Sequence, residues 1–417
     1  MTLVDTTDPQ TSASPGRNPG ARFNIAYCHN QYQLRSGEDI AFENAVRLLR
    51  EDGHQVSVFS RSNLEIRKFS LADKLLFPIH TVYSPQRRRK VREFAGHEHS
   101  SIALVQNVFP LLSPSIYYGL AGAGLPIVQL VFNYRLLCTN GLLFTQGRIC
   151  ERCLGGNHLN GVLHRCYKDS YALSAIYATS IGLHRWLGTW TRCVTLFVTP
   201  DFFLKQKLIQ GGIPGDRIRV VSNPFDISAP APVYRPGDYA LFVGRLVSPK
   251  GIFTLLEASL QLDGRQVVIV GDGEEAERVR SHPAVLKGKS DFVGPVYGSR
   301  FAELLENAAF VVVPSEWYDN LPMIVCQAFA AGKPVIASQI NGIPEFVKHE
   351  QNGLLFSPGD SASLKQSMQR LFSDAALREK LGRGARRTAE TVLSPLVWQS
   401  KMTAVMEEAA RMHAGRS

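Results

Sequence analysis

The chain has 417 residues, of which 45% are hydrophobic and 20% are charged, and its formal net charge is +10. This length and composition predict a globular protein of two or three domains. The positive balance implies an anionic partner, such as a nucleoside diphosphate, an anionic membrane surface or a nucleic acid, and the sign alone does not choose among them.

Residues 1–21 are rich in Thr, Ser, Pro and Gly and lack the basic start and apolar core of a signal peptide. They therefore predict a disordered leader, with no export, and a cytoplasmic protein. No uncharged apolar run reaches the roughly 18 residues expected of a membrane span. Because the cytosol disfavours disulfides, the seven cysteines should be reduced thiols or metal ligands.

Short runs of β-branched, aromatic and other apolar residues alternate with helical patterns through the first half of the chain. Strands are expected at residues 23–28, 56–59, 102–105, 127–131 and 194–198. This alternation predicts a doubly wound β/α domain. Polar residues follow the first, third and fourth of these strands, namely Gly37 and Glu38, Gln106, and Asn133.

A basic cluster lies between the second and third expected strands, within residues 85–92. It consists of Arg87, Arg88, Arg89, Lys90 and Arg92. Such a cluster is most often a solvated helix face. The alternative is a contact with anionic lipid head groups, which attract basic residues by about 1 kcal/mol each.

Four cysteines follow the fourth expected strand with the spacing C-x11-C-x2-C-x12-C, at Cys138, Cys150, Cys153 and Cys166. Four thiols with one C-x2-C pair can form a tetrahedral structural zinc site, in which His158 or His164 could replace one thiol. The stronger zinc signature has two such pairs, so unligated thiols are the alternative.

Residues 169–190 predict one long helix that carries several aromatic side chains. These are Tyr171, Tyr177, Trp186 and Trp190. We expect them to pack in the core, with contact to a membrane interface as the alternative.

A proline-rich stretch at residues 226–237 predicts a linker, and the strand pattern resumes at residues 239–243. Gly244 and Arg245 follow that strand directly, and Lys250 comes five positions after Arg245. A glycine turn with two basic residues at a helix start attracts an anion, because backbone N–H groups and the helix dipole add to the charges. This is the clearest phosphate signal in the chain. The next expected strand, 267–270, leads to Gly271 and Gly273.

The segment 308–332 combines a buried strand, a polar loop and a helix of small residues. Pro314 ends the strand because it donates no hydrogen bond to a ladder. Residues 315–320 then place polar and acidic side chains at the carboxyl edge of the sheet, where open α/β sheets bind ligands, and a helix follows until Gly332. The segment predicts a ligand site.

Asp319 and Gln327 are eight positions apart in this segment, a spacing that resembles the E-x7-E element of retaining GT-B glycosyltransferases. Residues 327–337 resemble the run that follows this element, and residues 244–251 match the G-R-L-x-x-x-K-G stretch. On these motifs the sequence resembles glycosyltransferase family 4.

The resemblance implies two Rossmann-like β/α/β domains that face each other across a cleft. The expected parts are an acceptor-side domain at 22–225 with a Cys-rich insertion at 138–166, the linker, a nucleotide-sugar domain at 238–395, and a last helix at 396–417 that can cross back to the first domain. The implied reaction is retaining transfer from a UDP- or GDP-sugar to a saccharide or lipid-linked saccharide, in surface polysaccharide synthesis. It needs no metal for catalysis, and it would occur in the cytoplasm or at the inner face of the plasma membrane.

The resemblance also assigns residues to roles. Arg245, Lys250 and Asp319 are the expected catalytic residues. Donor contacts are expected from Gly244, Arg245, Lys250, Gly271, Gly273, Asp319, Asn320, Leu321, Pro322, Met323 and Gln327. The acceptor side is expected to include Gly37, Glu38, Gln106 and Asn133.

Asp319 stands in place of the first glutamate of the family pattern, and three further positions depart from that pattern. Gln106 and Phe132 stand where the family commonly has histidines, and Gln327 replaces the second glutamate. Glutamine still binds a ribose diol, with a loss on the order of 1–2 kcal/mol. These departures leave a catalytically weakened GT-B binding or scaffold subunit as the alternative. Nucleic acid is not an expected partner, since no recognised binding motif occurs.

Overall fold

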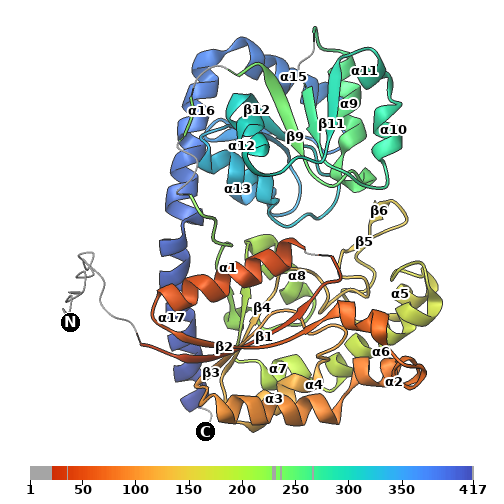
Figure 1. Ribbon diagram of the computed structural model, residues 1–417, viewed down its shortest axis with the longest axis vertical. Helices are drawn as coiled ribbons and strands as arrows, with labels where there is room; N and C mark the ends of the chain where they lie inside the picture. The colour runs from red at the N-terminus through yellow and green to blue at the C-terminus, as the bar shows by residue number, and fades with distance from the viewer. Residues whose placement is uncertain (1–20, 35, 228–231, 235–236, 265–266, 416–417) are drawn as a thin grey trace, which may run out of the picture.

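The computed structural model describes residues 21–34, 36–227, 232–234, 237–264 and 267–415. Two six-stranded parallel sheets form its two halves, with strand orders β2-β1-β3-β4-β7-β8 and β11-β10-β9-β12-β13-β14. Figure 1 shows one half above the other, with helices on both faces of each sheet. The expected fold of two Rossmann-like domains is confirmed. The leader at 1–20 and the linker residues 228–231 and 235–236 lie outside the described residues, and the domain boundaries stay a prediction.

The first sheet has short central strands that are buried along their whole length. Its strands are β1 (Asn24–Gln31), β2 (Gln55–Ser62), β3 (Ile102–Val105), β4 (Ile127–Leu130), β7 (Leu196–Thr199) and β8 (Ile218–Val220). Every position of β3, β4 and β7 is buried, as expected for a parallel sheet with helices on both faces.

Helices from different parts of the chain cover the two faces of this sheet. One core contains residues of α1 (Gly37–Glu51) and α17 (Pro395–Ala414). The other contains residues of α3 (Pro85–His97), α4 (Ser115–Gly122), α6 (Tyr171–Trp186), α7 (Thr189–Cys193) and α8 (Phe202–Gln210). The remaining elements of this half are η1 (Asn63–Lys68), α2 (Leu71–Val82), the hairpin β5 (Phe144–Thr145) and β6 (Arg148–Ile149), α5 (Leu159–Leu163) and η2 (Gly215–Arg217).

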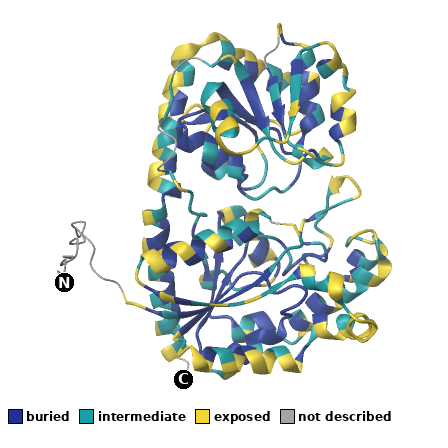
Figure 2. Ribbon diagram, in the orientation of Figure 1, coloured by how far each residue is buried: buried dark blue, intermediate teal, exposed yellow. Residues whose placement is uncertain are grey.

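The second sheet has the same parallel construction. Its strands are β9 (Tyr239–Val243), β10 (Val267–Val270), β11 (Ser290–Gly294), β12 (Ala308–Val313), β13 (Val335–Ser338) and β14 (Gly353–Phe356). Its helices are η3 (Ser248–Lys250), α9 (Ile252–Leu260), α10 (Ala276–Arg280), α11 (Pro283–Leu286), α12 (Gly298–Asn307), α13 (Met323–Ala330), α14 (Ile343–Phe346), α15 (Ser361–Ser373) and α16 (Ala375–Thr388). Figure 2 shows its strands buried and the outer faces of its helices exposed.

The last helix, α17, belongs to the core of the first half although it follows the second half in sequence. A π-helical turn, Ala389–Leu393, and the N-cap residue Ser394 separate it from α16. Met402 and Met406 are fully buried in the core of the first sheet, and Gln399 Nε2 donates to the Leu48 carbonyl at 2.8 Å. Figure 1 shows this helix along one side of the first half. The chain therefore connects its two halves twice.

Two helical regions differ from the sequence expectation. The helix expected at 169–190 is broken at Gly188, which has φ of +65°, so α6 and α7 are separate. Tyr177 and Trp190 are buried as expected, but Tyr171 and Trp186 are exposed, so the expected core packing was wrong for these two. The helix α2 was not predicted. Within the described ranges, no helix combines the length and apolarity needed to cross a bilayer.

Candidate active site

The two glycine loops of the second half pack backbone to backbone at the carboxyl ends of β9 and β10. The Leu246 N–H donates to the Asp272 carbonyl at 2.8 Å. A Cβ on Gly271 would lie 1.9 Å from the Gly244 carbonyl oxygen, and one on Gly273 would lie 2.3 Å from the Leu246 carbonyl oxygen. Any side chain would separate the loops, so this edge of the site requires glycine.

A second close approach connects α9 to the loop after β12. Gly251 is left-handed, with φ of +71°, and a Cβ there would lie 1.7 Å from the Pro314 carbonyl oxygen. The Glu316 N–H donates to the Pro249 carbonyl at 2.8 Å. These contacts bring Lys250, at the start of α9, beside the polar loop 315–320.

Lys250 and Asp319 form an ion pair. The Ser315 hydroxyl donates to the same Asp319 oxygen, Oδ2, at 3.2 Å, and the Asn341 side chain donates to the Asp319 carbonyl. The Lys250 ammonium also lies 5.9 Å from the centre of the Trp317 ring. Both charges are largely shielded from solvent, so the carboxylate holds the ammonium in place at the carboxyl edge of the sheet.

Arg245 differs from Lys250 because its side chain is exposed and, among the described residues, makes no hydrogen bond or ion pair. An exposed guanidinium on a glycine loop is available to an anionic ligand. Gln327 is half-buried on α13. Pro322 supplies no side-chain hydrogen bond to the N-terminus of α13, a position that suits an anion.

The loop after β12 also contacts the first half of the chain. Asn320 Nδ2 donates to the Phe132 carbonyl. The Tyr318 ring packs edge-on against Phe203, with 4.7 Å between ring centres, and Trp317 packs edge-on against Phe144 of the β5–β6 hairpin at 5.9 Å. The two halves therefore meet at the expected donor loop.

A second junction lies at the N-terminus of α8. Glu345, from α14 of the second half, accepts hydrogen bonds from the Phe202 and Phe203 N–H groups, both at 2.7 Å. Asp201 accepts from the Leu204 N–H at 2.7 Å. Burial, with the Glu345 carboxylate nearby, raises the pKa of Asp201 to about 6.

Three of the four expected acceptor-side residues are in contact. Gln106 Nε2 donates to the Glu38 carbonyl at 2.8 Å, and Asn133 Nδ2 donates to Glu38 Oε2 at 2.9 Å. The Tyr32 hydroxyl donates to the same carboxylate oxygen at 2.8 Å. Gly37 begins α1 without a positive φ, and a Cβ there would meet nothing within 4 Å, so packing does not explain this glycine.

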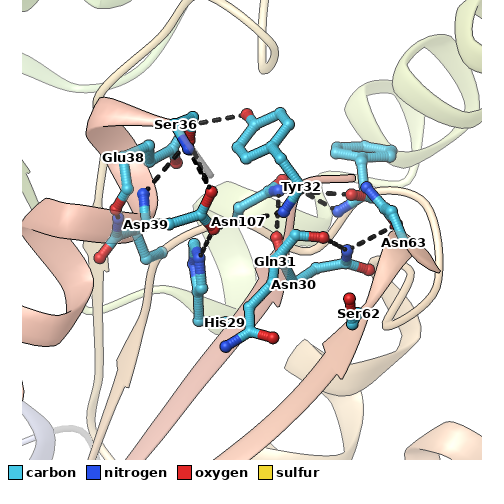
Figure 3. A network of polar contacts seen from close by, with 12 residues as sticks. His29, Asn30, Gln31, Tyr32, Ser36, Glu38, Asp39, Ser62, Asn63 and Asn107 are labelled. Carbon is cyan, nitrogen blue, oxygen red and sulfur yellow. Dashed lines mark hydrogen bonds and ion pairs between the residues drawn. The ribbon is translucent and has the colours of Figure 1, made fainter. Parts of the chain in front are cut away.

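A buried polar network at the end of β1 was not found from the sequence (Figure 3). His29 Nε2 lies 2.9 Å from Asp39 Oδ1. Burial alone would raise the pKa of Asp39, but hydrogen bonds from His29, Ser36 and Tyr32 outweigh it and lower the pKa to about 2. Asn30 accompanies this pair and receives a hydrogen bond from Asn107 at 2.7 Å. The available signal was a histidine at the end of the first strand, followed by the S-x-x-D capping box of α1.

The four cysteines of the expected zinc site line one small cavity, and all seven cysteines are free thiols. Within the described part of the chain, no set of three or more His, Cys, Asp or Glu side chains is arranged to hold a metal ion. The structure gives the zinc hypothesis no support. It stays a prediction, which metal analysis of protein purified without a metal-affinity tag would test.

Comparison with known proteins matches part of the second half, including the loops after β9, β10 and β12, to a known family model. The family model described as Glycosyl transferases group 1 matches residues 227–388. An uncharacterized glycosyltransferase of Methanocaldococcus jannaschii is 29% identical over 229 residues, which cover 50% of this chain and 58% of the relative. The lipopolysaccharide core biosynthesis glycosyltransferase LpsD of Rhizobium meliloti is 32% identical over 219 residues, which cover 50% of this chain and 62% of that relative. The matches thus span about three-fifths of these relatives' length.

Similarity to solved structures covers almost the whole chain. The structure of HepE from Anabaena in complex with UDP superposes with a TM-score of 0.65 and 15% identity, over 92% of this chain and 99% of that one. At this identity the comparison is evidence for the fold alone. The chain therefore has the GT-B fold, and residues 227–388 in its second half match the glycosyl transferases group 1 model.

Proposed function

We propose that this protein transfers a glycosyl group from a nucleoside diphosphate sugar to a saccharide acceptor, with retention of configuration. The observation that carries the proposal is the convergence of Arg245, Lys250 and Asp319 at the carboxyl edge of the second sheet. The loop that carries Asp319 contacts the first half, on which the acceptor-side residues lie.

The two cations supply electrostatic stabilisation of the leaving group. Breaking the bond between the anomeric carbon and the diphosphate leaves negative charge on the phosphate oxygens. Arg245 is available to bind these oxygens directly. Lys250 reaches them from the position in which Asp319 holds it, so that the diphosphate shares or replaces this carboxylate. The two side chains supply this stabilisation without a divalent metal.

The remaining expected donor contacts lie on α13 and the loop before it. The backbone N–H groups of Asn320, Leu321 and Met323 bind the phosphate or the sugar, and Gln327 contacts the ribose hydroxyls with one acceptor and one donor group. On the acceptor side, Glu38 accepts hydrogen bonds from Tyr32 and Asn133. These bonds fix the carboxylate, which then orients acceptor hydroxyls.

The proposed acceptor is a saccharide or a lipid-linked saccharide of surface polysaccharide synthesis, at the inner face of the plasma membrane. The similarity to a lipopolysaccharide core glycosyltransferase supports this class. The basic face of α3 supports the membrane location, because Arg88, Arg89, Lys90 and Arg92 are all exposed there and attract anionic head groups.

A second candidate is a GT-B binding or scaffold subunit with weakened catalysis. The observation that favours it is the position of Gln106, whose oxygen accepts from Tyr27 and whose nitrogen donates to Glu38. Gln106 thus uses both ends of its amide inside the protein, at a place where the resembled family commonly has a histidine.

Two measurements test these functions. Calorimetric titration with UDP and GDP should show binding, and a panel of UDP- and GDP-sugars should show turnover with a lipid-linked acceptor extract. Binding without turnover would favour the scaffold. If neither nucleoside diphosphate binds, and neither raises the melting temperature, the donor site and the transferase proposal are both wrong.

A further inference from the structure

The helix α2 exposes its apolar side chains instead of burying them. Leu71, Leu75 and Ile79 are 80%, 78% and 62% exposed, and Leu76 is exposed as well. Of the twelve residues of α2, only Thr81 is buried. Residues four apart lie on one face of a helix, so Leu71, Leu75 and Ile79 form a continuous apolar row. Burial against the described part of the chain does not explain that row.

Neighbouring helices extend the apolar surface. Both α2 and α5 pack beside α6. We call the exposed large apolar residues of these three helices the apolar edge: Leu71, Leu75, Leu76, Ile79, Leu159, Leu163, Tyr171, Leu183 and Trp186. Figure 2 shows exposed α2 and α5 together at one side of the first half. Exposed apolar side chains gathered on neighbouring helices in this way mark an interaction site.

The excess positive charge of the chain lies in two segments that include the helices of this edge, and five of these cations, Arg87, Arg88, Arg89, Lys90 and Arg92, belong to α3. Residues 61–97 contain nine Lys and Arg against three Asp and Glu, and residues 148–192 contain six against two. Together these segments account for the whole net charge of +10, so the rest of the chain is balanced. Apolar side chains within a basic region are complementary to a partner that has an apolar interior and a negatively charged surface. An anionic bilayer has that construction.

A cavity of about 310 Å³ lies against α2. Its lining combines residues of α2, among them Phe77 and Thr81, with cations from neighbouring segments. Its charged and titratable lining residues are Arg61, Glu65, Lys68, Asp73, His80 and Arg87. Arg61 pairs with Glu65, whereas Lys68 forms no ion pair among the described residues. Burial and the nearby Arg61 guanidinium lower the pKa of Arg87. Arg61 and Arg87 therefore lie close enough to repel each other, while Glu65 attracts both, and an anion in the cavity would add to that attraction.

This cavity adjoins the acceptor side of the first half. Leu111 lines it, and the Leu111 N–H donates to Asn30 Oδ1 at 2.7 Å. Asn30 Nδ2 donates to Asn63 at 2.8 Å, and both belong to the polar network at the end of β1. An anion in the cavity would thus lie at the same end of the sheet as the acceptor-side residues.

We propose that α2, α5 and α6 dock the protein on an anionic membrane, with the leucine row of α2 among the acyl chains and a lipid phosphate in the cavity behind it. The phosphate belongs to a phospholipid or to a lipid-linked acceptor, which share this chemistry. Only the assignment to an acceptor rests on the proposed transferase function, because docking is independent of transfer.

Co-sedimentation tests the docking, with phosphatidylcholine vesicles that either contain or lack phosphatidylglycerol. The unmodified protein should bind the vesicles that contain phosphatidylglycerol, and salt should weaken the binding. The double variant Leu75→Ser, Ile79→Ser should bind at least about tenfold more weakly, because two apolar side chains no longer enter the bilayer. The control is Leu286→Ser, which alters an equally exposed leucine of the second half and should change nothing.

The cavity has its own pair of variants. Lys68→Gln with Arg87→Gln should weaken binding to phosphatidylglycerol vesicles by about tenfold, while Lys287→Gln, an exposed control on the second half, should not. Competition by inorganic phosphate distinguishes a free phosphate site from a lipid site. If inorganic phosphate protects the unmodified protein from thermal unfolding but the protein does not bind vesicles, the membrane assignment is wrong.

Two further outcomes would overturn the proposal. If the unmodified protein ignores all vesicles, docking does not occur. If light scattering shows a dimer that the Leu75→Ser, Ile79→Ser variant converts to a monomer, a second copy covers the apolar edge instead. Titration of each variant with UDP and GDP separates these failures from failure of the transferase proposal, because the donor site lies on the other half of the chain.

Discussion

The proposed donor side and the proposed acceptor side of the site are built in different ways. On the donor side, backbone segments approach so closely that Gly251, Gly271 and Gly273 have no room for a side chain. On the acceptor side, side chains from separate strands make the contacts, as Glu38 does with Gln106 and Asn133. The first kind of site requires particular residues within short segments. The second requires only that distant side chains meet, and it tolerates more replacements.

The largest effect is expected from the loss of the exposed cation on the donor side. Arg245→Ala should weaken UDP or GDP binding by about 2–4 kcal/mol, because a charge-assisted contact to the diphosphate is lost. Calorimetric titration measures this effect. The control is Arg278→Ala, which removes an exposed arginine from α10 of the same half. Equal affinity of Arg245→Ala and the unmodified protein would disprove the phosphate assignment.

Substitution at a glycine of the donor side should act on the backbone. Gly251→Ala should destabilise the second half by on the order of 1–3 kcal/mol, because the residue is left-handed and its Cβ would meet the Pro314 carbonyl. Chemical denaturation measures the change. On the acceptor side, Gly37→Ala has free space and ordinary φ, and it should leave stability equal or raise it by less than about 1 kcal/mol. Similar losses of stability in Gly251→Ala and Gly37→Ala would contradict the inferred difference in construction between the two sides.

The junction of the two sides should respond to pH. The pKa of Asp201 is raised to about 6 in the folded protein from an ordinary 3.8, so the folded state binds more protons between these values. Stability from this group therefore falls as pH rises from about 4 to about 6, and it stays low at pH 7.

Asp201→Asn should remove this dependence while its side-chain oxygen still accepts the Leu204 N–H bond. At pH 7 the variant should be more stable by on the order of 1–3 kcal/mol, and near pH 4 the two proteins should converge. Denaturation curves across this range measure the difference. A difference that does not vary with pH would show that Asp201 is not the titrating group.

How far the sequence predicts each side follows from this construction. The glycine loop and both cations at 244–251 lie within eight consecutive residues, so a local pattern reveals them. Central strands such as β3 and β4 were also predictable, because buried parallel strands read as continuous apolar runs. The contact of Asn320 with Phe132 joins residues 188 positions apart, and no local pattern encodes it. The leucines of α2 have helical spacing but face outward, so their exposure required the structure.

On the acceptor side, a single charge change should leave the donor side unaffected. Glu38→Gln keeps the size of the side chain but replaces one carboxylate oxygen with an amide, and it weakens the bonds from Tyr32 and Asn133. We expect transfer to fall through a higher KM for acceptor, by about 1–2 kcal/mol, with UDP or GDP affinity unchanged. Steady-state kinetics and titration measure the two effects. A loss of nucleotide binding would place Glu38 on the donor side instead.

The smallest effect is expected from restoring the second glutamate of the E-x7-E pattern. If Gln327 contacts the ribose, Gln327→Glu gives the diol two acceptors in place of one, while its negative charge acts against the diphosphate. The two effects oppose each other, so UDP or GDP affinity should hold or rise by less than about 1 kcal/mol. Gln369→Glu, on the exposed face of α15, controls for the added charge. Because α13 carries Gln327 beside the loop of Asp319, a loss of more than about tenfold in affinity for both nucleotides would mean that the added charge meets the phosphates and not the ribose.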